Sequence, residues 1–242
     1  MGRHGTIAGR KAAQDSKRAA MFTKYGRAII VAAKAGGDPD YNATLRVAIE
    51  KAKAIGMPND NIKRAIKKGT GELDGETYVE QSFEGYGLAG VAVIVEALTD
   101  NTNRTVASVR AAFDKYGGNL GTTGSVSFMF SEKGLIVIDN EDEELDEDEV
   151  MMEALDCGAE DFEAEGETFT VYTTPDDFNA VVKAMEEKGY VFASAGIEMV
   201  PQNYIKLTNE DDIKNMTKML DMFEDNDDVQ NVWHNWENPD EE

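Results

Sequence analysis

Cysteine and histidine are almost absent from this chain of 242 residues, and their scarcity removes several classes of function. The single cysteine, Cys157, cannot form a disulfide within the chain, and it excludes zinc or iron–sulfur sites built from several cysteines. Such cysteine usage is typical of a reducing compartment, so we expect a cytoplasmic protein. The only histidines, His4 and His234, have no nucleophile beside them in the sequence. We therefore predict no catalytic residues, no enzyme activity, no metal and no cofactor.

Long hydrophobic runs are also lacking. No segment approaches the roughly 18 apolar residues that a membrane-spanning helix requires. The charged residues 1–7 are not followed by the apolar stretch of a signal peptide. Hydrophobic residues nevertheless make up 41% of the chain, which is enough for packed cores. We expect a folded protein of roughly one to three domains that has no membrane partner.

The net charge of −23 conceals an uneven distribution along the chain. Residues 1–71 contain fifteen lysines and arginines against five aspartates and glutamates, which gives this segment a net charge of +10. Residues 72–242 contain nine basic against 42 acidic residues, a net charge of −33. A basic segment within an acidic chain indicates a module that binds a polyanion, although a solvated basic surface is the alternative interpretation.

The basic segment has the hydrophobic periodicity of three helices, which we expect at about residues 10–35, 42–55 and 58–68. Glycine and proline residues separate them at 36–40 and at 56–58. We predict phosphate contacts from the lysines and arginines of these helices and of the preceding tail, with little direct base readout. Aromatic residues are too few here for a platform that stacks single strands. The expected contacts are Arg3, Arg10, Lys11, Lys17, Arg18, Lys24, Arg27, Lys51, Lys53, Lys63, Arg64, Lys67 and Lys68.

The acidic remainder alternates between strand and helix patterns and predicts an α+β body. Residues 135–202 read as β-α-β-β-α-β, the ferredoxin-like order. We expect a second ferredoxin-like unit around them, with strands at 78–84, 91–98, 125–130 and 229–236 and helices at 104–116 and 211–223. The predicted domains are thus a basic helical domain (1–75), an α+β domain (76–134 with 203–242) and an acidic domain inserted in it (135–202).

Several motifs have a structural and a functional interpretation. Gly85–Gly90 matches G-x-G-x-x-G, but a strand follows it, so a tight hairpin is favoured over a dinucleotide site. The glycine-rich loop at 117–124 favours a helix-to-strand connection over a phosphate loop. The acidic run at 140–149 lacks the spacing of a calcium loop and favours a solvated helix start. Arg104, at the start of a predicted helix, is a candidate for a secondary contact with the partner.

Motifs in both parts of the chain resemble one known family. They include Lys11–Arg18, Met57–Ile62, Arg64–Gly71, Leu98–Asn101 and Gly117–Gly121. Together they are similar to the YebC/PmpR family of probable transcriptional regulators over essentially the whole chain. The resemblance implies a helical domain followed by two α+β domains, a cytoplasmic location, DNA binding and transcriptional control. The family that the chain resembles also includes mitochondrial members that activate translation at the ribosome.

Three hypotheses about function follow. The first is a DNA-binding transcriptional regulator that acts through the basic helical domain. The second is a translation factor that binds ribosomal RNA or tRNA through the same surface. The third is a scaffold whose acidic domains bind protein partners. The sequence leaves the oligomeric state open between a monomer and a weak dimer.

Overall fold

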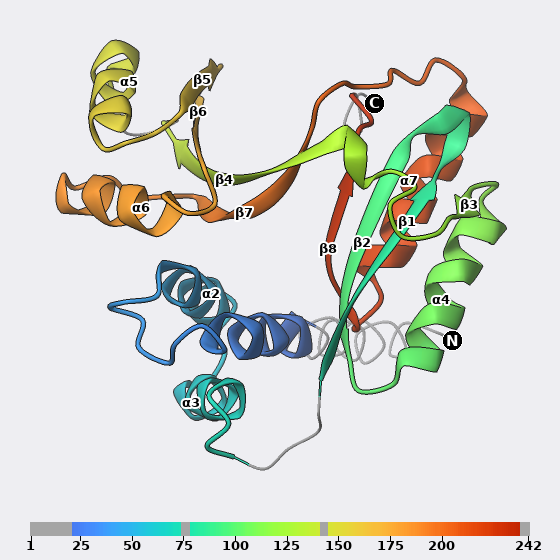
Figure 1. Ribbon diagram of the computed structural model, residues 1–242, viewed down its shortest axis with the longest axis horizontal. Coiled ribbons are helices and arrows are strands. Elements are labelled where there is room, and N and C mark those ends of the chain that lie inside the picture. The colour runs from blue at the N-terminus through green and yellow to red at the C-terminus, as the bar shows by residue number, and fades with distance from the viewer. Residues whose placement is uncertain (1–20, 74–77, 141–144, 238–242) are drawn as a thin grey trace, which may run out of the picture.

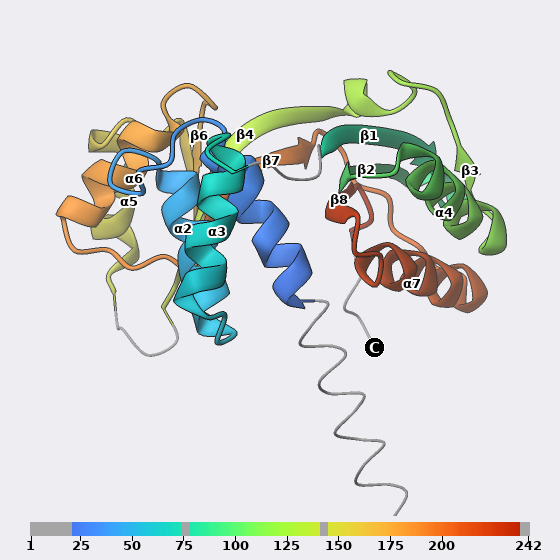
Figure 2. The same ribbon diagram turned by 90° about the horizontal axis from the view of Figure 1, so that it is seen from below.

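The computed structural model describes residues 21–73, 78–140 and 145–237. Their elements form a helical unit and two four-stranded antiparallel sheets. In Figure 1 the helical unit lies below the second sheet and beside the first. Figure 2 shows the two sheets at opposite ends of an arch, with the helical unit on its concave side. The mixed α+β class expected from the sequence is confirmed.

The helical unit consists of a helix over residues 21–33, α2 (Ala43–Ala54) and α3 (Asn59–Gly69). Asn42 begins α2, because its side chain accepts a hydrogen bond from the Leu45 amide at 3.0 Å. The three helices share a core of small and branched side chains that includes Ile29, Leu45, Ala52 and Ile62. This packing hides the apolar face of each helix and leaves the charged faces outward.

The first sheet has the strand order β3-β1-β2-β8 and combines segments from both ends of the acidic body. Its strands are β1 (Val79–Tyr86), β2 (Ala92–Thr99), β3 (Asn119–Leu120) and β8 (Val229–His234). Two helices, α4 (Thr102–Lys115) and α7 (Glu210–Glu224), cover one face. Phe113 of α4 and Phe223 of α7 lie with ring centroids 5.1 Å apart in the shared core.

The third strand of this sheet differs from the sequence expectation. We expected a strand at 125–130, but the strand lies earlier, at Asn119–Leu120, and residues Ser127–Met129 form a 3-10 turn. The buried carboxylate of Glu84 provides the reason. It accepts hydrogen bonds from the amides of Gly124, Val126 and Ser127 at 2.8–2.9 Å, so these amides cannot pair with a neighbouring strand.

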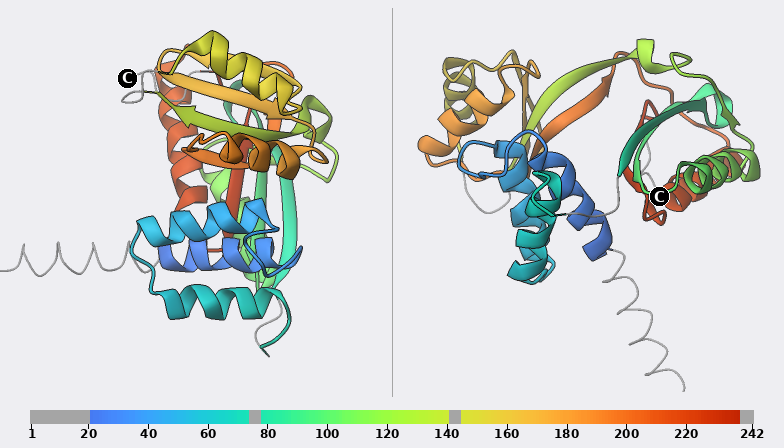
Figure 3. Two further views of the ribbon diagram at one scale, coloured as in Figure 1. Left: turned by 90° about the vertical axis from the view of Figure 1, so that its left-hand side faces the viewer. Right: turned by 60° about the horizontal axis from the view of Figure 1, so that its bottom comes forward.

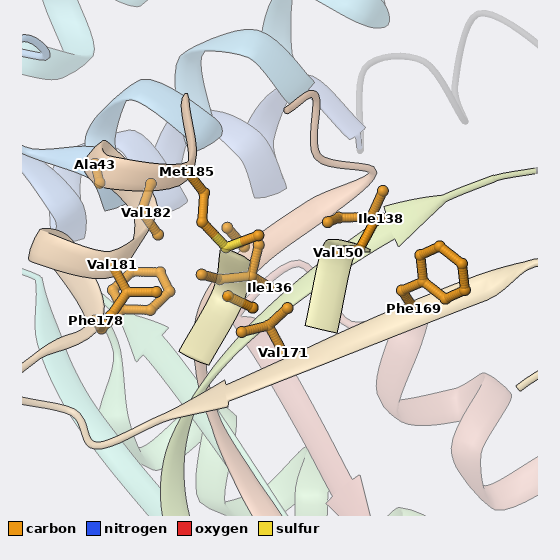
Figure 4. Close-up of a cluster of buried hydrophobic side chains, with 12 residues drawn as sticks. Ala43, Ile136, Ile138, Val150, Phe169, Val171, Phe178, Val181, Val182 and Met185 are labelled. Carbon is orange, nitrogen blue, oxygen red and sulfur yellow. The ribbon is translucent and has the colours of Figure 1, made fainter. Parts of the chain in front are cut away.

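The second sheet, of order β5-β6-β4-β7, has the predicted ferredoxin-like sequence of elements. The elements are β4 (Phe130–Asp139), α5 (Glu147–Asp156), β5 (Asp161–Glu165), β6 (Thr168–Thr173), α6 (Phe178–Glu187) and β7 (Ser194–Pro201). Figure 4 shows side chains of α6, including Phe178 and Met185, packed with Ile136 and Val171 of the sheet. Ala43 of α2 joins this core, so the helical unit packs directly against the second sheet.

Strands β4 and β7 form a long ribbon that joins the two sheets. They pair from Phe130 opposite Pro201 to Val137 opposite Ser194. Figure 3 shows this ribbon arching over the helical unit toward the first sheet. The domain boundary predicted at 134/135 falls within β4, so this strand crosses the boundary without a break.

Candidate nucleic-acid interface

The structure separates the basic residues of the helical unit into two groups. Arg27, Lys34 and Arg46 form ion pairs with the acidic body. The remaining seven form no ion pair with any described residue, and all seven were predicted as phosphate contacts. They are Lys24, Lys51, Lys53, Lys63, Arg64, Lys67 and Lys68. Five are exposed, and Lys24 and Lys68 are partly buried. Cations without protein partners can pair with phosphates without first breaking an internal contact.

Helix α3 brings four of these cations together. It buries Ile62 and Ala65 against the other helices, which leaves the intervening charged positions outward. Lys63 and Lys67 are an i, i+4 pair, as are Arg64 and Lys68, so like charges lie side by side. Such pairs cost a few tenths of a kcal/mol each in an isolated helix, and an anionic partner would remove this repulsion.

Gly69 fixes the position of α3. A Cβ atom at this residue would lie 2.4 Å from the carbonyl oxygen of Ile30 and 2.6 Å from the Cβ of Ala33. Only glycine permits such a close approach of the last turn of α3 to the helix over residues 21–33. The close contact at Gly69 therefore sets the direction in which the basic face of α3 points outward.

Arg27 corrects the predicted set, because its side chain is 90% buried and faces the protein. Its guanidinium donates to the Asp228 carboxylate at 2.9 Å and to the carbonyl of Asp227, and it lies 5.6 Å from the ring centroid of Tyr78. A buried, paired arginine cannot reach a phosphate without leaving an uncompensated charge behind. Arg27 therefore connects the helical unit to the first sheet.

Arg104 meets the same carboxylate from the other side. Its guanidinium donates to Asp228 at 2.8 and 3.0 Å and to Asp100 at 2.8 Å. Burial by itself would raise the pKa of Asp228, but hydrogen bonds from Arg104 and Thr105 and the charges of Arg27 and Arg104 outweigh it and lower that pKa. The expected partner contact of Arg104 stays a prediction; what the structure shows is an internal role.

Five predicted contacts, Arg3, Arg10, Lys11, Lys17 and Arg18, lie outside the described residues.

The sequence analysis did not assign roles to two cations that hold the units together. Lys34 pairs with Glu80 of β1 at 2.8 Å, and Arg46 pairs with Glu186 of α6 at 2.6 Å. Their partners are more than 45 residues away, and no local pattern reveals such a pairing.

The glycine motifs have structural roles. The motif Gly85–Gly90 spans the end of β1 and the 3-10 turn that leads into β2, as the hairpin interpretation predicted. In the loop before β4, Glu84 already occupies the amides that a phosphate would need. Burial would raise the pKa of the Glu84 carboxyl group, but three hydrogen bonds from backbone amides outweigh this effect and lower it.

Among the described residues no three metal-binding side chains lie close enough together to hold a metal ion, and no helix is long and apolar enough to cross a membrane.

Two models of known protein families together match nearly the whole chain. Residues 3–72 match the family described as "TACO1/YebC protein N-terminal domain", and residues 78–236 match "TACO1/YebC second and third domain". The chain belongs to the TACO1/YebC family. This result confirms the resemblance found in the sequence motifs.

Relatives of this TACO1/YebC protein match it over almost their full length. A "Probable transcriptional regulatory protein" of Clostridioides difficile is 56% identical, with 98% of this chain and 99% of the relative covered. A protein of the same description from Finegoldia magna is 52% identical, with 96% of each covered. The crystal structure of a conserved hypothetical protein from Aquifex aeolicus superposes with a TM-score of 0.82 at 42% identity, covering 94% of this chain and 93% of that one.

In this TACO1/YebC protein a cleft of about 740 Å³ lies where the helical unit, the first sheet and β7 meet. Its helical wall includes Lys24 and Lys51, two of the unpaired cations, and the ring of Tyr25. Its sheet wall includes the carboxylates of Glu96 and Glu198. The basic surface therefore continues into a cleft whose opposite wall is acidic.

Proposed function

We propose that this protein regulates transcription in the cytoplasm by binding DNA through the basic face of its helical unit, and that it acts by binding rather than by catalysis. The observation that carries the proposal is the set of seven lysines and arginines that have no ion-pair partner among the described residues. The three paired cations attach the unit to the body, and five of the seven unpaired ones are exposed. Relatives over 50% identical are named probable transcriptional regulatory proteins, which supports the regulatory role.

The acidic body supports the proposal through its electrostatics. Its net charge of −33 over residues 72–242 disfavours a polyanion on the body as a whole. Among the described residues the unpaired cations of the helical unit offer the attractive surface, so a nucleic acid is directed to that unit and to the cleft beside it. A translation factor that binds ribosomal RNA would use the same surface, which makes it the alternative to test.

The first experiment reverses charge on α3. The double variant K63E/R64E places two carboxylates where two phosphate contacts are proposed, and we expect its affinity for a random-sequence DNA duplex to fall by at least about tenfold at low salt. Fluorescence anisotropy measures this loss. The matched control is K214E/K218E, which makes the same change on exposed residues of α7 and should leave the affinity within about twofold, because α7 carries no proposed phosphate contact.

Equal losses in both double variants would contradict binding through the helical unit, because they would report net charge alone. To separate DNA from RNA, the wild type is incubated with genomic promoter fragments and, separately, with ribosomes for co-sedimentation at moderate salt. Enrichment of particular promoter fragments supports the transcriptional proposal. Ribosome binding without such enrichment contradicts it and identifies a translation factor.

A further inference from the structure

We propose that the cleft between the helical unit and the first sheet is a base pocket that takes one unpaired guanine of a bound single-stranded segment, with Glu96 as the residue that selects the base. This inference rests on the proposed nucleic-acid binding and adds a specificity-determining site to it. The sequence indicated phosphate contacts with little base readout, and it gave no role to Glu96.

Glu96 occupies an unfavourable environment for a carboxylate. It lies partly buried in the middle of β2, opposite Ser82 of β1 and Asn231 of β8, on the sheet face that α4 and α7 do not cover. Its carboxylate accepts a long hydrogen bond, 3.4 Å, from the side-chain amide of Asn231, and it forms no ion pair with a described residue. Burial raises the pKa of Glu96, and the nearby charges of Glu80, Glu132 and Glu198 raise it further, although Asn231 lowers it.

Glutamine has the same shape and would avoid this electrostatic cost, so the stability of the fold does not explain a carboxylate here. Residues that break a local rule at a cost to stability mark functional sites. Because Glu96 lines the cleft, its carboxylate can accept further hydrogen bonds from a ligand. A donor-rich ligand would supply the compensation that the protein itself does not.

The chemistry of the lining selects the base. Guanine presents two adjacent donors, N1–H and the exocyclic amino group, which match the two oxygens of one carboxylate. The amide of Asn231, also in the lining, can donate to the neighbouring O6. Uracil and thymine lack the exocyclic amino group, so they cannot form the paired contact. Unpaired bases are commonly read in this way, by an aromatic ring against the face and polar groups at the edge.

The opposite wall suits the rest of the nucleotide. Lys24 and Lys51 lie on the helical side of the cleft, where they can bind the phosphates on either side of the base. Tyr25, on the same wall, supplies an aromatic ring. A volume of about 740 Å³ lies within the usual range of ligand sites and exceeds what one base requires. The two walls thus match the anionic and the donor-rich ends of a nucleotide.

The test compares two fluorescent single-stranded decamers at one salt concentration, one of deoxythymidine only and one with a single central deoxyguanosine. We expect the wild type to bind the guanine-containing decamer about tenfold more tightly, the value of one good bidentate contact. In E96Q this preference should disappear, so that the two decamers bind with equal affinity. The matched control is E132Q, which removes one exposed charge near Glu96 from outside the cleft and should keep the preference.

Stability provides an independent check that E96Q is folded, because its melting temperature should equal or exceed that of the wild type. If the wild type binds both decamers equally, the base pocket is wrong and the proposed function stands. If neither decamer nor duplex binds, the proposed function fails. In that case saturation-transfer NMR with GMP and UMP still tests the pocket: a guanine-selective signal lost in E96Q supports it, and its absence overturns it.

Discussion

At the scale of single residues, Asp228 decides how the helical unit is attached. Its buried carboxylate receives Arg27 from the helical unit, and Arg104 and Thr105 from α4. A carboxylate with this many donors is held in its charged form, and its removal leaves Arg27 buried without a counter-charge. One side chain thus determines both the local charge balance and the contact between two units.

The variant D228N tests this role. We expect a loss of about 3 kcal/mol in the free energy of unfolding at neutral pH, because a buried arginine loses its partner. The control is D227N, whose side chain is exposed and whose loss should stay below about 0.5 kcal/mol. Chemical denaturation of both variants measures the difference, and a similar small loss in each would contradict a buried ion pair.

The contribution of Asp228 to the free energy of unfolding decreases as the pH is lowered. The pKa of Asp228 is lowered in the folded protein, so its stabilisation is complete above the unfolded-state pKa of about 4 and is lost as the pH falls through the folded-state pKa. Wild type should therefore lose its stability advantage over D228N below pH about 4.

At the scale of elements, α3 is positioned by a close helix–helix approach. G69A places a methyl group 2.4 Å from the Ile30 carbonyl, and neither backbone can move freely. We expect a destabilisation of about 1–3 kcal/mol, typical of overpacking. Thermal unfolding followed by circular dichroism measures it.

The matched control is another glycine of the same helical unit. A Cβ atom at Gly26 would meet nothing within 4 Å, and the residue lies inside the helix over residues 21–33. G26A should stabilise the protein by up to about 1 kcal/mol through helix propensity. Opposite signs for the two changes would show that packing, and not composition, fixes α3; stabilisation by both would contradict it.

At the scale of the whole molecule, the basic and acidic parts act together. Attraction is confined to one unit, so binding should depend steeply on salt. Between about 50 and 200 mM salt we expect roughly a 10³-fold loss of DNA affinity if six or seven phosphates are contacted. Replacing Lys63, Arg64, Lys67 and Lys68 by alanine should reduce the slope of log K against log salt by up to about 3.6. An unchanged slope would place the phosphate contacts elsewhere.

The sequence by itself determined the charge division, the helical periodicity of the basic segment and the ferredoxin-like order of residues 135–202, because these depend on composition and on local spacing. Tertiary structure alone decided which cations are free. Arg27 and Lys24 lie three residues apart on one helix, yet only Arg27 meets a buried carboxylate, more than 200 residues away. The same holds for Glu96: its alternation along β2 is visible in the sequence, but its cleft exists only because three distant segments meet around it. Ion pairs between distant residues and clefts between units depend on how the chain folds, so the local spacing of residues does not reveal them.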